Sequence, residues 1–280
     1  MSTAPAVSDP RLDEPYALTP EQIERFRADG FIKLKDVLSE ELLDEYGDEI
    51  TRLTLELNPN EDKPLEERDT YSRAFIQVHN LWCKSETANT FAFSKRLARI
   101  ATELIGTEGV RMYHDQSLYK EAGGGFTPWH VDQQYWPLSS GKTVTAWMPL
   151  QAVPIEMGPL CFGKGSHRKN IGRDLEISDE SEQIIREQIR DQGIVEVFEP
   201  YDLGEVSFHN GWTVHRAGPN TTAQPRKVHT IIYMDKDMRL IEPKNKNQRN
   251  DWERWSPSTK PGEVMDDPLN PILYDKSSDA

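Results

Sequence analysis

A short segment near the middle of the chain carries two side chains that commonly bind metals, one residue apart. The segment Trp129–Gln134 follows a glycine run and a proline, and it contains His130 and Asp132. Side chains two positions apart on a strand point to the same face, so we expect these two to lie side by side. One imidazole nitrogen and one carboxylate oxygen on a common face suit a first-row divalent metal. The segment therefore predicts two ligands of a metal site.

His215 is the candidate third ligand, in the downstream segment Phe208–Asn220. The dipeptide Asn210-Gly211 predicts a two-residue hairpin whose second strand carries this histidine. Two histidines and one carboxylate on one side of a metal leave three positions open, as in non-haem Fe(II) oxygenases. An oxidisable cosubstrate takes two of these positions, and O₂ takes the last. The same three side chains also bind Zn²⁺ with a water, so a zinc hydrolase is an alternative hypothesis.

Arg226 follows His215 by eleven residues, at the start of another predicted strand. A planar guanidinium at the floor of a pocket pairs bidentately with a carboxylate. A hydrolase needs no such clamp for a cosubstrate, so Arg226 favours the oxygenase. A third hypothesis is a barrel that binds a small molecule without catalysis, and the intact ligand set argues against it.

The three ligands and Arg226, in this order, resemble the Fe(II)/2-oxoglutarate-dependent dioxygenases of the phytanoyl-CoA dioxygenase family. The resemblance covers roughly residues 19–235. It implies a double-stranded β-helix (jelly roll, cupin-like) with Fe(II) inside, 2-oxoglutarate chelating the iron, and Arg226 holding the far carboxylate. Three further segments carry the resemblance: Asp29–Ile32 before a capped helix, Ala146–Leu150 after the His-x-Asp motif, and Gly158–Arg168 with its Gly-Ser-His sequence.

The resemblance also implies roles for residues around the ligands. Gln116 and Trp147 match positions where the family contacts the cosubstrate. The family often has Ser two residues after the distal histidine, where this chain has Ala217 and so lacks one hydrogen bond to the cosubstrate. Related halogenases replace the ligand carboxylate by Gly or Ala, so the presence of Asp132 favours a hydroxylase or another oxidative enzyme.

The expected reaction is hydroxylation of an unactivated C–H bond, with 2-oxoglutarate leaving as succinate and CO₂. The expected substrate is a small natural product, lipid-like molecule or amino-acid derivative. The core motifs contain no Lys/Arg cluster for a CoA phosphate, which argues against a CoA thioester. Gln77, Gln133 and Tyr135 are candidate substrate-binding residues because they lie near the motifs. We interpret the other histidines near these motifs as structural: His114, His167, His209 and His229.

The pattern around these residues predicts one mainly β domain with flanking helices over residues 19–280. Helical elements fill residues 19–106, with helices expected at Glu21–Ala28, after Ser39 and at Thr87–Leu104. A jelly-roll core is expected at about residues 107–235, where short β-type runs follow one another. These runs cover residues 110–120, 129–136, 143–150, 159–163, 194–198, 205–209, 212–215 and 227–233, with an acidic, helix-prone stretch at 174–190.

The two ends of the chain differ in character. Residues 1–18 are rich in Pro, Ala and Asp, and we expect them to be flexible. The C-terminal tail, residues 236–280, is polar but carries Trp252 and Trp255, so part of it is expected to dock on the domain. The N-terminus lacks the basic region and apolar core of a signal peptide, and no apolar run is long enough to span a bilayer.

Composition narrows the class of partner. The chain has 33 Lys+Arg against 47 Asp+Glu, a formal charge of −14, which repels nucleic-acid phosphates and anionic membranes. Its two cysteines, Cys83 and Cys161, are too few for a disulfide scaffold or a Cys-rich zinc site. We therefore expect a cytoplasmic protein that acts on a small molecule without nucleic-acid or membrane partners. The oligomeric state is left open.

Overall fold

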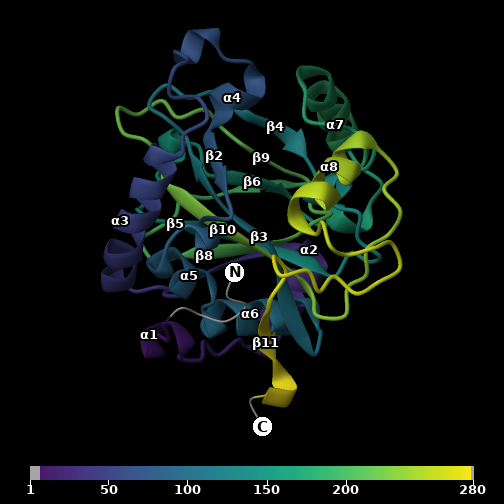
Figure 1. Ribbon diagram of the computed structural model, residues 1–280. Helices are drawn as coiled ribbons and strands as arrows, with labels where there is room; N and C mark the ends of the chain where they lie inside the picture. Colours follow the sequence, from purple (N-terminus) through teal and green to yellow (C-terminus); the bar gives the residue numbers. More distant parts are fainter. Residues whose placement is uncertain (1–6, 279–280) are drawn as a thin grey trace.

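Two antiparallel β-sheets form the centre of the protein (Figure 1). The computed structural model describes residues 7–278, with the side chain of Tyr71 left aside. The larger sheet has the order β1 (Phe31–Leu34), β8 (Val206–Asn210), β5 (Thr143–Pro149), β10 (Val228–Asp235), β3 (Gly109–Tyr119) and β11 (Ile272–Asp275), and β2 (Ile76–His79) also pairs with β3. The smaller sheet has the order β4 (Thr127–His130), β9 (His215–Ala217), β6 (Leu160–Gly163) and β7 (Glu196–Phe198).

From β3 to β10 the chain passes back and forth between the two sheets. β3, β5, β8 and β10 lie in the larger sheet, and β4, β6, β7 and β9 lie in the smaller one. This winding is that of a double-stranded β-helix, and it confirms the predicted jelly roll with flanking helices. The winding brings the end of β4 and the start of β9 together, although they are far apart in the sequence.

The two faces of the larger sheet have different surroundings. On β5, Ala146 belongs to the main hydrophobic core, whereas Thr145 and Trp147 line a cavity on the opposite face. Because side chains alternate between faces, residues paired across strands share a face with their partners. Two cross-strand rows point into this cavity: His114, Ile232, Thr145 and His209 form one, and Gln116, Thr230 and Trp147 form the next.

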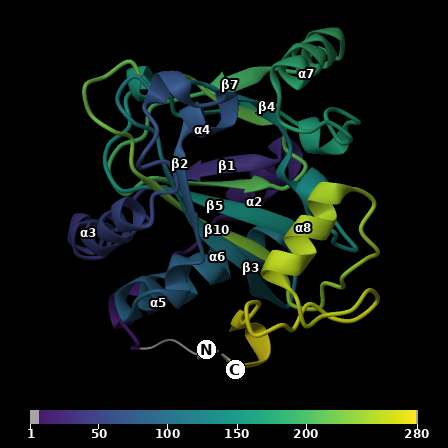
Figure 2. The same cartoon turned by 45° about the horizontal axis from the view of Figure 1, so that its top comes forward.

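Helices cover the core face of the larger sheet (Figure 2). Ser39 caps α3 as predicted, and Thr19 caps α2 in a capping box with Gln22. The predicted single helix over Thr87–Leu104 is wrong, because the Ser94 side chain accepts a hydrogen bond from Leu97 N and starts a second helix. The covering helices are α2 (Pro20–Asp29), α3 (Glu40–Glu56), α5 (Glu86–Ala92) and α6 (Lys95–Ile105), and the short α4 (Thr70–Ala74) follows a loop.

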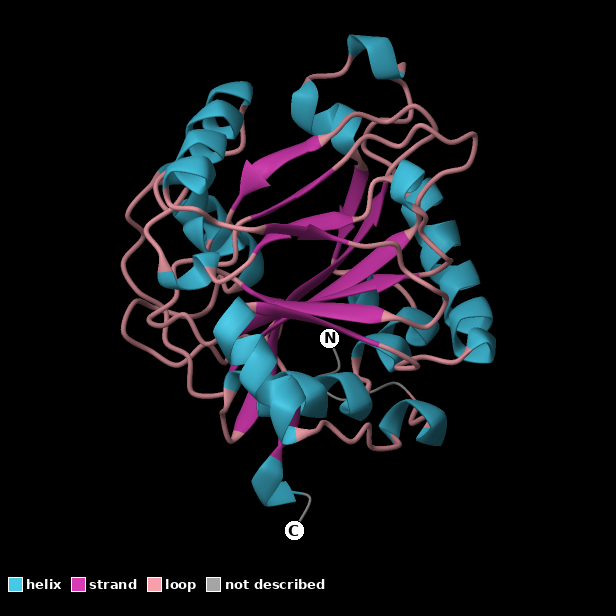
Figure 3. Ribbon diagram, turned by 180° about the vertical axis from the view of Figure 1, so that it is seen from behind, coloured by secondary structure: helices cyan, strands magenta, loops and turns pink. Residues whose placement is uncertain are grey.

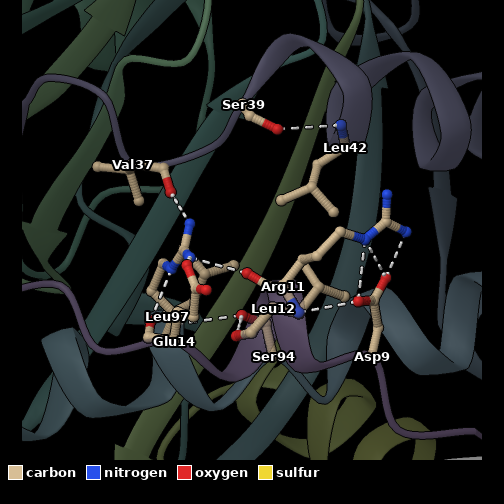
Figure 4. Close-up of polar contacts among 10 residues, drawn as sticks. Asp9, Arg11, Leu12, Glu14, Val37, Ser39, Leu42, Ser94 and Leu97 are labelled. Carbon is tan, nitrogen blue, oxygen red and sulfur yellow. Dashed lines mark hydrogen bonds and ion pairs between the residues drawn. The ribbon is translucent and has the colours of Figure 1, made fainter.

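Part of the N-terminal segment is ordered, which corrects the expectation that residues 1–18 are flexible (Figure 4). Asp9 caps the short helix α1 (Pro10–Asp13), and its carboxylate also binds the guanidinium of Arg11. Leu12 is buried in the main core, and its carbonyl accepts a hydrogen bond from Ser94 Oγ at 2.9 Å. The burial of this one apolar side chain therefore docks the otherwise polar N-terminal segment on the main core. Residues 1–6 lie outside the described residues.

Two further helices stand on the other side of the sheets, so that the strands lie between helices (Figure 3). The predicted acidic helix exists as α7 (Asp179–Asp191), which packs against β4. In the C-terminal tail, α8 (Lys246–Trp255) packs near residues 132–135, and β11 joins the larger sheet. Docking of the tail is thus confirmed, with the Trp255 side chain buried. None of the helices within residues 7–278 has the length and apolar character needed to cross a membrane.

The predicted hairpin at Asn210-Gly211 is wrong. β8 ends at Asn210 in the larger sheet, and β9 begins only at His215, in the smaller sheet. The chain does turn here, because Asn210 O accepts a hydrogen bond from Thr213 N at 2.8 Å. The Asn-Gly pair therefore makes the turn that its residue types favour, but this turn carries the chain from one sheet to the other.

Candidate metal centre

His130 and His215 are direct cross-strand partners, one at the end of β4 and one at the start of β9. The Nδ1 atom of His130 lies 2.8 Å from Pro128 O, and that of His215 lies 2.9 Å from Thr213 O. An Nδ1–H in this position donates to the carbonyl and leaves the Nε2 lone pair for a cation. Burial lowers the pKa of each imidazole to about 4, so both are in the neutral form that a metal ligand requires.

Asp132 completes the set from a different local structure than expected. β4 ends at His130, and Asp132 begins a short 3₁₀ helix (Asp132–Tyr135), so the prediction of one continuous strand is wrong. Its Oδ1 atom still lies 3.6 Å from His130 Nε2 and 3.7 Å from His215 Nε2. One ligand atom from each residue lies within 4.8 Å of the others. Two nitrogens and one oxygen on one side fit a first-row divalent metal that keeps open positions.

The second carboxylate oxygen of Asp132 has partners of its own. Oδ2 accepts a hydrogen bond from Thr145 Oγ1 at 3.2 Å, and His209 Nε2 lies 3.3 Å away. Thr145 and His209 are cross-strand partners in the larger sheet, so one row of that sheet braces the carboxylate. Burial raises the pKa of Asp132, but His215 and the hydrogen bond from His209 outweigh this effect. The pKa is therefore lowered well below its ordinary value, and the carboxylate is ionised.

His209 is a site residue that sequence reasoning missed. Its position in the sequence gave it no visible relation to His130, because that relation depends on how β5 pairs with β8. The available signal was the alternation on β5, which places Thr145 and Trp147 on one face. Only the strand register adds His209 to that face.

A cavity of about 430 Å³ lies in front of the three ligands, between the sheets. This volume is in the range of sites that enclose small molecules. Trp147 and Arg226 line one part, which we call the Arg226 end. Residues of α8, among them Asp251 and Trp255, line another part, which we call the α8 end. The metal ligands face the same space as both ends.

Among the described residues, Arg226 is a buried cation without an anionic partner. Its side chain is 1% exposed, and its guanidinium lies 5.2 Å from the centre of the Trp147 ring. Nη1 donates to Gly158 O, whereas Nε has no hydrogen-bond partner in the described part of the chain. Burial lowers the pKa of Arg226 to about 10, which still leaves it charged near neutral pH. Such a guanidinium fits the carboxylate of a ligand in the cavity.

Lys120 is a second buried basic residue beside Arg226, outside the cavity lining, and the sequence analysis did not single it out. Their backbones are hydrogen-bonded to each other, and Lys120 Nζ donates to Gly125 O. Burial lowers the pKa of Lys120 well below its usual value, and the charge of Arg226 lowers it further. The positive charge at the Arg226 end of the cavity is therefore that of Arg226 itself, and it favours an anion.

The remaining predicted site residues divide into two groups. Gln116 and Gln77 line the cavity, and Gln77 Nε2 donates to Gln116 Oε1 at 2.6 Å. Tyr135 also lines it, and its hydroxyl accepts a hydrogen bond from Ile177 N at 2.9 Å. Gln133 does not line the cavity. Its Oε1 atom accepts from Thr143 Oγ1 at 2.7 Å and its Nε2 atom donates to Ser140 O, contacts that hold the loop between η3 (Asp132–Tyr135) and β5.

Comparison with known proteins agrees with this geometry. The family model of phytanoyl-CoA dioxygenase (PhyH) matches residues 26–228. The chain belongs to the phytanoyl-CoA dioxygenase family. It is thus a dioxygenase of the Fe(II)- and 2-oxoglutarate-dependent type, which confirms the resemblance seen in the sequence and does not favour the zinc hydrolase.

Individual relatives are distant but cover most of the chain. An ectoine dioxygenase of Bordetella bronchiseptica is 24% identical over 248 residues, which are 81% of this chain and 79% of the relative. A methylphosphonate hydroxylase of Gimesia maris is 25% identical over 228 residues, 77% of this chain and 80% of the relative. The crystal structure of the epimerase SnoN with Fe³⁺, alpha ketoglutarate and nogalamycin RO has a TM-score of 0.74 and 25% identity, covering 91% of this chain and 98% of SnoN.

Proposed function

We propose that this dioxygenase hydroxylates an unactivated C–H bond of a small organic molecule. The observation that carries the proposal is that His130, Asp132 and His215 face the same cavity as the unpaired guanidinium of Arg226. When bound, Fe(II) supplies the oxidising chemistry, using O₂ and the electrons that 2-oxoglutarate releases as it becomes succinate and CO₂. A zinc hydrolase would have no use for a buried arginine in this position.

Each residue has a distinct part in this proposal. His130, Asp132 and His215 hold the iron, and Thr145 and His209 keep the Asp132 carboxylate in its orientation. Arg226 binds the far carboxylate of 2-oxoglutarate, with Nε, which has no hydrogen-bond partner among the described residues, as one donor. Trp147 packs on that guanidinium and excludes water from the pair, which strengthens it.

Other residues shape the pocket for the two organic ligands. Gln116 lies on the same cross-strand row as Trp147, so it is placed to contact the cosubstrate near iron. Gln77 is hydrogen-bonded to Gln116 and lies toward the substrate, as does Tyr135. Together they position a C–H bond next to the metal, which is the part of the reaction that the protein itself controls.

Hydroxylation is proposed because Asp132 fills the ligand position that a halide needs in halogenases. The solved relatives include an enzyme named as a carbocyclase, SnoK, and one named as an epimerase, SnoN. Other relatives are named for ectoine and for methylphosphonate, two chemically different small molecules. These names do not agree on one substrate, so the substrate class of this chain is proposed from the lining of its own cavity. A cytoplasmic location stays a prediction.

The test is anaerobic titration of the metal-free protein with Fe(II) and then 2-oxoglutarate. A visible charge-transfer band from the chelated keto acid is expected in the wild type. We expect Asp132→Ala to abolish the band and Arg226→Ala to require much more 2-oxoglutarate. The matched control is Arg190→Ala, because Arg190 is exposed on α7. No band in the wild type, with Zn²⁺ bound tightly instead, contradicts the proposal and favours the hydrolase.

A further inference from the structure

The α8 end of the cavity has a lining of its own that the metal and the cosubstrate do not use. Asp251 and Trp255 come from α8 in the C-terminal tail, Trp136 comes from the end of the 3₁₀ helix that carries Asp132, and His79 comes from β2. Figure 1 shows α8 on the opposite side of the sheets from α3. These four residues come from separate parts of the chain, so the lining exists only in the folded protein.

Aromatic rings form a continuous wall at this end. The Trp255 ring lies 4.9 Å from His79 and 4.9 Å from His114, measured between ring centres. Tyr113 connects this group to Trp136 without itself lining the cavity, with its ring 5.3 Å from His114 and 5.4 Å from Trp136. The faces of such rings carry partial negative charge and attract organic cations.

A carboxyl group is set into this wall. Asp251 lines the cavity, and its Oδ2 atom accepts a hydrogen bond from the Tyr113 hydroxyl at 3.2 Å. Burial raises the pKa of Asp251 to about 7, while Tyr113, Arg254 and Trp255 act in the opposite direction. Burying an unpaired charge is costly, so a cation bound beside the Asp251 carboxylate stabilises its ionised form.

The groups around Asp251 supply little positive charge in return. Burial lowers the pKa of His79 to about 4 and that of His114 to about 3, so both rings are neutral near pH 7. Arg254 is the one cation of α8 among the cavity-lining residues, and its side chain is exposed to solvent. Glu176, also exposed, adds a second acid to the lining. The α8 end thus pairs neutral aromatic rings with carboxylates.

We infer that the α8 end binds an organic cation on the substrate, a protonated amine or a quaternary ammonium, against Asp251 and the aromatic wall. This inference rests on the proposed function, since it names the class of molecule that is oxidised. The two ends of the cavity then have opposite preferences. Arg226 favours the dianionic cosubstrate, whereas Asp251 and the rings favour a cationic substrate.

The preference of the α8 end for a cation argues against oxyanions as the substrate class. An oxyanion such as a phosphonate needs buried arginine or lysine side chains, or clustered backbone N–H groups. Among the described residues that line the cavity, the buried cation is Arg226, where the cosubstrate is proposed to bind, and Arg254 at the α8 end is exposed. A phosphonate at the α8 end would instead lie against Asp251. The charge pattern of the α8 end therefore argues against a phosphonate substrate for this chain.

The test is direct binding of three probes to the metal-free full-length protein by calorimetry, at about pH 8.5, where a carboxyl with a pKa near 7 is ionised. The probes are choline, its uncharged isostere 3,3-dimethyl-1-butanol, and methylphosphonate. The variants are Asp251→Asn, which keeps shape and removes charge, and Asp191→Asn as a control on exposed α7. Circular dichroism confirms that each variant is folded.

We expect the wild type and Asp191→Asn to bind choline about 10-fold more tightly than the uncharged isostere, with no binding of methylphosphonate at this end. Asp251→Asn is expected to remove most of that preference. The inference is overturned if choline binds no more tightly than the isostere, if Asp251→Asn keeps the full preference, or if methylphosphonate competes with choline. Because no metal is present, these outcomes are independent of the charge-transfer band that tests the proposed function.

Discussion

His209 lies with its Nε2 atom 3.3 Å from Oδ2 of Asp132, whereas Oδ1 lies 3.6 Å from His130 Nε2 and 3.7 Å from His215 Nε2. The two oxygens of Asp132 are therefore divided: Oδ1 faces the histidine ligands, and Oδ2 faces the larger sheet. A carboxylate fixed in this way presents one oxygen to a metal, in a defined direction. Partners of this kind, one step removed from the metal, orient a ligand and tune its affinity.

Replacing His209 by Leu is expected to weaken metal binding by about 10- to 100-fold, because Asp132 then keeps only Thr145 as a partner. The measurement is the dissociation constant of Mn(II), followed by electron paramagnetic resonance. His167→Leu serves as the control, since His167 lies outside the cavity. Unchanged Mn(II) affinity in His209→Leu would show that Thr145 alone positions the carboxylate.

The His-x-Asp motif, His215 and Arg226 were predictable because each is marked by residue type and spacing. The fold class was predictable from the run of short β segments. Two kinds of feature could not be predicted from the sequence. Local geometry after His130 depends on a strand ending where the sequence continues to look extended. The positions of His209 and of Asp251 depend on strand register and on docking of α8, which no short-range pattern encodes.

The Asn210-Gly211 hairpin failed for a related reason. An Asn-Gly pair predicts that the chain reverses direction, but it does not indicate which sheet the next strand joins. In this double-stranded β-helix the strand after the turn joins the opposite sheet, so β8 and β9 do not pair. The predicted helix over Thr87–Leu104 is two helices in the structure, because Ser94, a common cap residue, caps the second one instead of lying inside the first.

Ala217→Ser is expected to tighten binding of 2-oxoglutarate by about 5-fold, as one added hydrogen bond contributes about 1 kcal/mol. Ala217 is buried and lines the cavity, and it pairs across strands with Thr127 and Leu160. The measurement is anaerobic titration of the Fe(II)-loaded protein with 2-oxoglutarate. Ala217→Cys is the matched control, similar in size but a weak donor. Equal affinity in all three proteins would place the cosubstrate out of reach of this position.

The stability of the protein is expected to depend on pH through Asp251. Its pKa is about 7 in the folded protein against an ordinary value of 3.8, so folding favours the protonated form. This contribution is fully present below the ordinary pKa and is lost as the pH rises through about 7. Relative to Asp251→Asn, the wild type should therefore lose on the order of 2 kcal/mol of unfolding free energy between about pH 5 and pH 8.

Urea denaturation of both proteins at the two pH values measures this difference, and other titrating groups cancel in the comparison. Arg254 and Tyr113 are the nearest groups that act on Asp251, and both are kept in the variant. A difference that does not change with pH would mean that the carboxyl is ionised in the folded protein throughout this range.

Gly158 is expected to be intolerant of a side chain, with effects on both stability and Arg226. Its φ is +70°, and a Cβ there would lie 2.2 Å from Gly218 O, while its own carbonyl accepts the Arg226 guanidinium. Gly193, at φ +63°, has no atom within 4 Å of such a Cβ, so Gly193→Ala isolates the cost of backbone conformation. We expect Gly193→Ala to cost about 1 kcal/mol of unfolding free energy, and Gly158→Ala on the order of 2 kcal/mol more. Only Gly158→Ala should also weaken 2-oxoglutarate binding, because relief of the clash moves the carbonyl that holds Arg226; equal losses in both variants would contradict this link.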